Sequence, residues 1–151
     1  MGTPQSFGEN MNQITIRAME NRDIESALQL WRQSFNRGFS EGFDTAEVIT
    51  RYLEHNVNFS TVAFEGDVLV GALLCGHDGR RGSIYHTAVY PSHRGLGIGK
   101  LMEQRALHEL KNAGITTGFL FVNLNNPGSK AFWESIGWRV IEDVRYLYKE
   151  F

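Results

Sequence analysis

A glycine-rich turn between a strand-like run and a helical run constrains the fold of this 151-residue chain most strongly. Residues 83–89 have strand-like composition, and apolar residues recur at helical spacing over residues 98–113. Between them stand Gly95, Gly97 and Gly99. Glycines let a ligand approach the backbone closely, and the N–H groups of a helix's first turn attract anions. The sequence therefore predicts a strand, turn and helix that bind phosphate.

Two familiar phosphate-binding loops do not fit this turn. A P-loop requires a glycine where the chain has Arg94 and a hydroxyl where it has Leu101. The dinucleotide fingerprint G-x-G-x-x-G requires two residues before its third glycine, where this chain has one, and it follows the first strand of its domain. Both are therefore excluded.

A third pattern fits. Arg94, Gly97 and Gly99, preceded by Ala-Val-Tyr-Pro at residues 88–91, match R/Q-x-x-G-x-G/A and resemble the GCN5-related N-acetyltransferase (GNAT) superfamily. The resemblance implies that this turn binds the pyrophosphate of acetyl-CoA, and that one N–H of the preceding strand faces the thioester oxygen. The implied cofactor-binding residues here are Thr87, Ala88, Val89, Arg94, Gly95, Leu96, Gly97, Ile98, Gly99 and Lys100. The alternative is an ordinary glycine turn before a helix.

A second signature lies near the C-terminus. Asn126, Ser129 and Trp133, followed by Ile-Gly-Trp at residues 136–138, resemble the family pattern N-x-x-A-x-x-x-Y…G-F. The resemblance implies that all three contact the cofactor, although a plain helix cap also explains Asn126. Trp133 replaces a tyrosine that protonates the leaving thiolate in many relatives, and an indole cannot do so.

The general base is not evident from the sequence. Ser83 and Phe121 occupy the positions of the glutamates used by protein-modifying branches of the family. Tyr85 and His86 are the catalytic candidates, with a packed core role as the alternative for each; His77, Glu41 and Tyr148 are further possibilities, as is ordered water. Strand alternation predicts that His86 shares a face with Ile84 and Ala88, opposite Tyr85.

Two loops suggest substrate contacts. Residues 76–83 followed by Tyr85 resemble the small bacterial YpeA-like branch, and Arg80 and Arg81 are candidates to reach an anionic substrate or the cofactor phosphates. Simple solvation is the alternative for both arginines. In the loop at residues 36–43, the expected substrate-binding residues are Phe39, Glu41 and Phe43.

The expected fold class is α/β, the GNAT fold. Its central sheet is mostly antiparallel and splayed between the fourth and fifth strands, with helices on both faces. The predicted order is β-α-α-β-β-β-α-β-α-β-β, in one domain over residues 13–151 after a flexible lead-in at residues 1–12. Asn21 and Asp44 are expected to cap the first two helices. A hairpin turn is expected at residues 65–67 and a buried strand at residues 117–122. Gly114 and Gly137 are expected to end the two last helices, and the closing strands are expected at residues 138–141 and 144–148.

Composition narrows the function classes. The net charge is −2, so nothing favours a nucleic-acid partner, and no apolar stretch is long enough to suggest a membrane span. The single cysteine, Cys75, fits a reducing, cytoplasmic setting. We expect an N-acetyltransferase that uses acetyl-CoA and no metal, and that acetylates a small-molecule amine in a ternary complex. A homodimer is left open. The alternatives are a protein N-terminal or lysine acetyltransferase and a non-catalytic CoA-binding sensor.

Overall fold

The computed structural model describes residues 13–35 and 42–151, and the chain divides into one unit ending at Leu120 and another spanning Phe121–Phe151. The elements of the first unit are β1 (Ile14–Ala18), η1 (Asn21–Asp23), α1 (Ile24–Ser34), α2 (Ala46–His55), β2 (Thr61–Glu65), β3 (Val68–His77), β4 (Gly82–Val89), η2 (Pro91–His93), α3 (Ile98–Asn112) and β5 (Gly118–Phe119). No helix of the described residues is long and apolar enough to cross a membrane.

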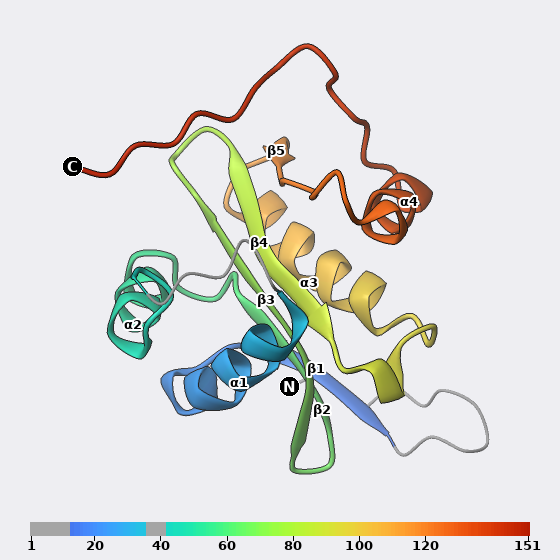
Figure 1. The fold of residues 1–151 in the computed structure, drawn as a ribbon. Coiled ribbons are helices and arrows are strands. Elements are labelled where there is room, and N and C mark those ends of the chain that lie inside the picture. The colour runs from blue at the N-terminus through green and yellow to red at the C-terminus, as the bar shows by residue number, and fades with distance from the viewer. Residues whose placement is uncertain (1–12, 36–41) are drawn as a thin grey trace. The chain divides into compact units, whose positions relative to one another are not determined.

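The first unit is built on a five-stranded mixed sheet in the order β1-β2-β3-β4-β5. Neighbours from β1 to β4 are antiparallel, whereas β4 and β5 are parallel and pair only at Gly82 with Gly118 and Ser83 with Phe119. From Ile84 onward, β4 has no β5 partner. Figure 1 shows α1 and α2 on one face of this sheet and α3 on the other. The mixed α/β architecture expected from the sequence is therefore confirmed.

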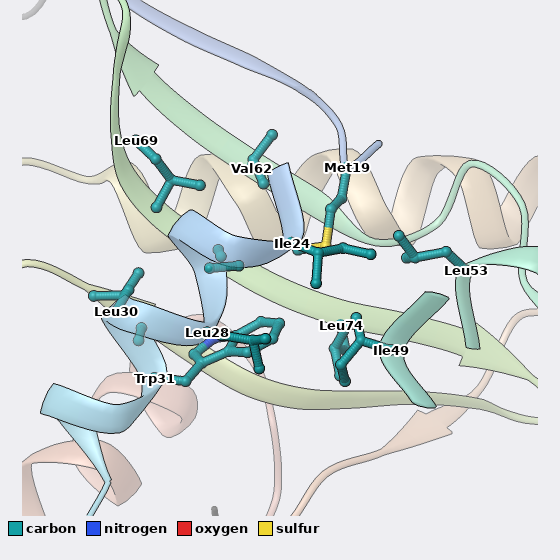
Figure 2. Packing of buried hydrophobic residues seen from close by; sticks show 13 residues of the cluster. Met19, Ile24, Leu28, Leu30, Trp31, Ile49, Leu53, Val62, Leu69 and Leu74 are labelled. Atoms are coloured by element: carbon teal, nitrogen blue, oxygen red, sulfur yellow. The ribbon is translucent and has the colours of Figure 1, made fainter. Parts of the chain in front are cut away.

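The main core lies between the sheet and the helices α1 and α2. Trp31 and Leu28 of α1 are fully buried against strand residues such as Leu74, and α2 adds Ile49 and Leu53 (Figure 2). Burial of side chains of this size stabilises the fold by about 1.5–3 kcal/mol each. These contacts fix both helices on the sheet face that carries part of the candidate site.

On the opposite face of the sheet, two glycines allow α3 to pack closely against the strands. A Cβ placed on Gly71 would lie 3.0 Å from Met102 Cε, and one on Gly82 would lie 2.6 Å from Leu110 Cδ1. Both glycines therefore leave space for apolar side chains of α3. The helix ends as predicted at Gly114, which has φ of +85°.

The predicted helix caps are wrong at both α1 and α2. Asn21 lies inside η1, and α1 begins after Asp23. At α2 the cap is Thr45, whose Oγ1 accepts a hydrogen bond from the Val48 N–H at 3.2 Å. Asp44 is instead buried, with its carboxylate beside His86.

The closing strands are also not formed. Residues 138–141 and 144–148 have no strand pairing, and the strand expected at residues 117–122 contains only Gly118 and Phe119. A strand exists only where a neighbour completes its ladder, and composition alone supplies no neighbour. The β-branched and aromatic content of these segments was therefore an insufficient signal.

The second unit contains α4 (Pro127–Ser135). Its cap is Asn126, whose Oδ1 accepts a hydrogen bond from the Ser129 N–H at 3.1 Å. Trp133 is buried, with its ring edge-on to Trp138 at 5.7 Å between centroids. Gly137, with φ of +103°, ends the helix as expected.

Candidate active site

The glycine turn has the conformation that an anion site requires. Gly95 and Gly97 adopt φ of +77° and +83°, and a Cβ added to either would meet no atom within 4 Å. Gly97 precedes the first turn of α3, and the first hydrogen bond of the helix runs from the Leu101 N–H to the Gly97 carbonyl at 3.0 Å. The N–H groups of Ile98, Gly99 and Lys100 therefore have no acceptor within the helix. They form a positive end to which phosphate can bind.

Contacts on both sides of the glycine turn fix its position between β4 and α3. The Arg94 side chain donates from Nε to the Val89 carbonyl at 2.9 Å, which ties the turn to the end of β4. Ile98 is 1% exposed and anchors the first turn of α3, whereas Leu96 stays exposed at the tip. The structure thus brings the predicted residues from Arg94 to Lys100 together in one turn and the first turn of α3.

A β-bulge interrupts β4 just before this turn. Ala88 pairs with Ala72 and Tyr85 with Leu74, so two residues of β4, His86 and Thr87, lie opposite one residue of β3. His86 adopts φ of +55°, which is rare for a residue with a side chain and is typical of functional sites. A bulge also leaves the N–H of its extra residue outside the ladder.

The bulge overturns the predicted side-chain alternation. Tyr85 lies edge-on against Tyr52 of α2, and His86 contacts Trp31 and Phe35 at the end of α1. Both side chains therefore contact helices on the same face of the sheet, and the prediction that Tyr85 points to the opposite face from His86 is wrong. The extra residue shifts the alternation by one position.

His86 and Asp44 form a buried pair (Nε2 to Oδ1, 3.0 Å). Their side chains are 13% and 5% exposed. Because an ionised carboxylate can only accept, His86 donates from Nε2 and the carboxylate fixes the orientation of the ring. Asp44 was expected only as a helix cap. Its partner lies 42 residues away, so no local pattern could have revealed the pair.

A pocket of about 280 Å³ lies near the start of β4. It is lined by Tyr52, Asn56, His77, Asp78, Arg81, Ser83, Tyr85 and Phe119. Tyr85 therefore both lines this pocket and directly precedes the bulge. Tyr85 and Arg81 were candidates from the sequence, whereas Tyr52 was not.

The other predicted residues are distributed as follows. Phe39 and Glu41 lie outside the described residues, and Phe43 is 49% exposed. Asn126, Ser129 and Trp133 lie together on or beside α4 in the second unit.

Cys75 is unsuited to act as a nucleophile. It is fully buried in β3, and burial raises the pKa of its thiol to about 12, although Arg105 opposes the shift. A thiol with such a pKa carries almost no thiolate at neutral pH. The chain's only cysteine is thus a packing residue.

The first unit fits the phosphate and pantetheine portions of an acyl-CoA. The open turn at Gly97 suits pyrophosphate, and β4 from Ile84 onward offers backbone groups that β5 does not use. Thr87 adds a buried Oγ1 that has no hydrogen-bond partner among the described residues. A buried polar atom of this kind is expected to have a partner, which a bound group can supply.

Comparison with known proteins agrees with this geometry. The sequence model of the Acetyltransferase (GNAT) family matches residues 24–138. An acetyltransferase of Pectobacterium atrosepticum is 30% identical over 144 residues, which cover 88% of this chain and all of that protein.

Solved structures share the fold. PaiA N-acetyltransferase from Thermoplasma acidophilum in complex with coenzyme A has a TM-score of 0.74 at 21% identity, over 87% of this chain and 92% of that one. An aminoglycoside acetyltransferase from an uncultured soil metagenomic sample, in complex with sisomicin, has a TM-score of 0.74 at 19% identity. The match covers 91% of this chain and 96% of that one. The family match, the glycine turn and the bulged strand lead to one conclusion: the chain belongs to the GNAT family and is an N-acetyltransferase.

Proposed function

We propose that the protein transfers the acetyl group of acetyl-CoA to the amine of a small molecule, by direct attack within a ternary complex. Acetyl-CoA supplies the acetyl group as a thioester. The observation that carries the proposal is the pocket of about 280 Å³ that is lined by Tyr85, the residue directly before the β4 bulge. An acceptor in this pocket would lie beside the strand expected to hold the thioester.

The backbone of β4 would stabilise the charge that develops on the thioester oxygen. The bulge at His86 and Thr87 frees an N–H from the sheet ladder, and the rigid strand fixes its direction. A donor preorganised for a developing oxyanion contributes about 3–4 kcal/mol in enzymes where it has been removed. Because the donor is a backbone group, this contribution does not depend on the absent glutamates.

His86 would take up the proton released by the amine. The amine nitrogen attacks the thioester carbonyl, a new N–C bond replaces the C–S bond, and the departing sulfur takes a proton from water. In the resting enzyme the hydrogen bond from Nε2 to Asp44 Oδ1 holds the imidazole in one orientation. Asp44 then stabilises the imidazolium, as a carboxylate does for other catalytic histidines.

Direct attack is favoured over an acyl-enzyme route. The thiol of Cys75 is buried and its pKa is raised to about 12, so it would be a poor nucleophile. An enzyme of this kind would show sequential kinetics, with both substrates bound before either product leaves.

A small acceptor fits the size of the pocket better than a peptide. Its volume of about 280 Å³ lies below the usual range for drug-sized ligands, about 300–1,000 Å³. The aminoglycoside acetyltransferase with the same fold is, by name, an enzyme of small amines, which is consistent with this assignment.

The test is a competition assay with acetyl-CoA and equal concentrations of small primary amines, amino acids, and peptides with free N-termini or lysines. Acetylated products are quantified by mass spectrometry. We expect the small acceptors to be acetylated faster. Faster acetylation of the peptides by more than about tenfold would overturn the assignment and favour a protein acetyltransferase. CoA binding without any acetyl transfer would favour the sensor.

A further inference from the structure

We propose that the pocket selects acceptors that carry a carboxylate, which pairs with Arg81, so that the substrates are amino acids or similarly sized amino carboxylates. The inference rests on the proposed function, because it assigns a substrate class to the same pocket. The inference is argued from the charged residues that line the pocket and from the ion pairs and hydrogen bonds that each of them makes.

Arg81 is a pocket cation that no carboxylate of the described residues neutralises. Its guanidinium lies over the Phe119 ring, with Cζ 4.6 Å from the ring centroid. Within residues 13–35 and 42–151 it has no ion pair. A cation–π contact uses the face of the guanidinium and takes up none of its N–H groups. Those N–H groups match the two oxygens of a carboxylate.

The acidic residue of the pocket, Asp78, is already engaged. Its Oδ1 accepts hydrogen bonds from the backbone N–H groups of Arg80 and Arg81, both at 2.9 Å. Its Oδ2 lies 3.2 Å from Nη2 of Arg80. These backbone hydrogen bonds, that of Arg81 first, lower the pKa of Asp78, so it is ionised and its charge is balanced by Arg80. Arg81 therefore gives the pocket a net positive charge.

The rest of the lining suits the body of a small amino carboxylate. Tyr52, Tyr85 and Phe119 supply aromatic surface for an apolar side chain. Asn56 is occupied, since its Oδ1 accepts from the His77 N–H at 3.0 Å. A carboxylate on Arg81 would leave the rest of the molecule among these rings, with Tyr85 leading to the bulge.

The experiment compares acceptors that differ only by the carboxylate. The probes are phenylalanine with phenethylamine, and tyrosine with tyramine. For each probe, kcat/KM is measured with acetyl-CoA for the wild type, Arg81→Gln and Arg80→Gln. Each acceptor is compared with itself across the variants, so differences in amine basicity cancel. Arg80→Gln is the matched control, because Arg80 is adjacent in sequence but pairs with Asp78.

We expect Arg81→Gln to lower kcat/KM for phenylalanine and tyrosine by about tenfold to a hundredfold, mainly through KM, because a charge-assisted hydrogen bond is lost. Phenethylamine and tyramine should change less than about threefold. The selective loss in Arg80→Gln should be much smaller than in Arg81→Gln, because Arg80 pairs with Asp78 and not with the acceptor. An equal effect of Arg81→Gln on both members of each pair, or no effect, would overturn the inference while leaving the acetyltransferase assignment intact.

Product binding tests the inference independently of turnover. Calorimetry on the CoA-saturated protein compares N-acetylphenylalanine with N-acetylphenethylamine. Tighter binding of the carboxylate, lost in Arg81→Gln and retained in Arg80→Gln, supports the inference. Equal affinities for the two compounds, or no binding of either, would overturn it. Failure of the proposed function would instead appear as an absence of acetyl transfer to every acceptor in the panel.

Discussion

Replacing Asp44 by asparagine separates a catalytic role of the Asp44–His86 pair from a purely structural one. The two side chains are 3.0 Å apart and nearly excluded from water. At an effective dielectric constant of about 20, unit charges at this separation attract by up to about 5.5 kcal/mol. Measured hydrogen bonds to charged groups contribute less, about 1.5–3 kcal/mol. If His86 becomes protonated during the reaction, Asp44→Asn should therefore lower kcat by about a hundredfold.

Stability should change much less, because asparagine has nearly the same volume and can still hydrogen-bond to His86. We expect the free energy of unfolding to fall by about 1 kcal/mol, which corresponds to about 2–4 °C in Tm for a chain of this size. Acceptor KM should stay within about threefold. A calorimetric Tm and a steady-state assay of CoA release together give both quantities.

The control is His86→Asn, alone and combined with Asp44→Asn. Asparagine tolerates the positive φ at position 86, so the bulge is preserved while the imidazole is removed. If the pair acts as a unit, the double variant should be no slower than His86→Asn. A kcat in Asp44→Asn within about threefold of the wild type, or additive losses in the double variant, would refute the catalytic role.

Three further predictions follow from the geometry. Gly97→Asp should weaken CoA binding more than a hundredfold by calorimetry, since it places a negative charge where phosphate binds; Gly114→Asp, with similar φ and equally open space, should not. Asp23→Asn should cost about 2 kcal/mol in urea unfolding at pH 7. Burial opposes ionisation of Asp23, but the Arg17 hydrogen bond at 2.7 Å and the Glu20 N–H lower its pKa overall. This contribution is present above about pH 4 and is lost as the pH falls through the lowered pKa, so wild type and variant should converge in acid; a constant difference would contradict the reasoning. Trp133→Phe should keep turnover within about tenfold, and a loss beyond a hundredfold in a folded variant would assign the indole an unrecognised role.

The glycine turn could be predicted from sequence because its determinants are local. Gly95 and Gly97 adopt positive φ, and the helix after them begins at Ile98, as the spacing indicated. The hairpin at Gly66 and the end of α3 at Gly114 were predictable for the same reason. Each depends on a backbone conformation that few residues other than glycine adopt.

His86 was a catalytic candidate from the sequence, but its carboxylate partner could not be predicted in the same way. Asp44 precedes a helix, and an aspartate there is commonly a cap, but Thr45 next to it takes that role. Its pairing with His86 requires the sheet and α2 to be assembled first. The bulge also depends on a distant part of the chain. It is a mismatch in the pairing register of β4 with β3, and no sequence pattern from Tyr85 to Thr87 indicates an extra residue.

The contacts of the His86 side chain, including its pairing with Asp44, stabilise the strained backbone of the bulge. A residue with a side chain held at positive φ costs of order 1–3 kcal/mol and persists only where surrounding contacts outweigh that cost. At His86 those contacts include the Asp44 carboxylate and the rings of Trp31 and Phe35. The side chain proposed to accept the proton therefore also holds the backbone in the conformation that directs an N–H of β4 out of the ladder. Base and oxyanion donor would then be positioned by one local structure, so substitutions that remove the packing around His86 should impair both functions together.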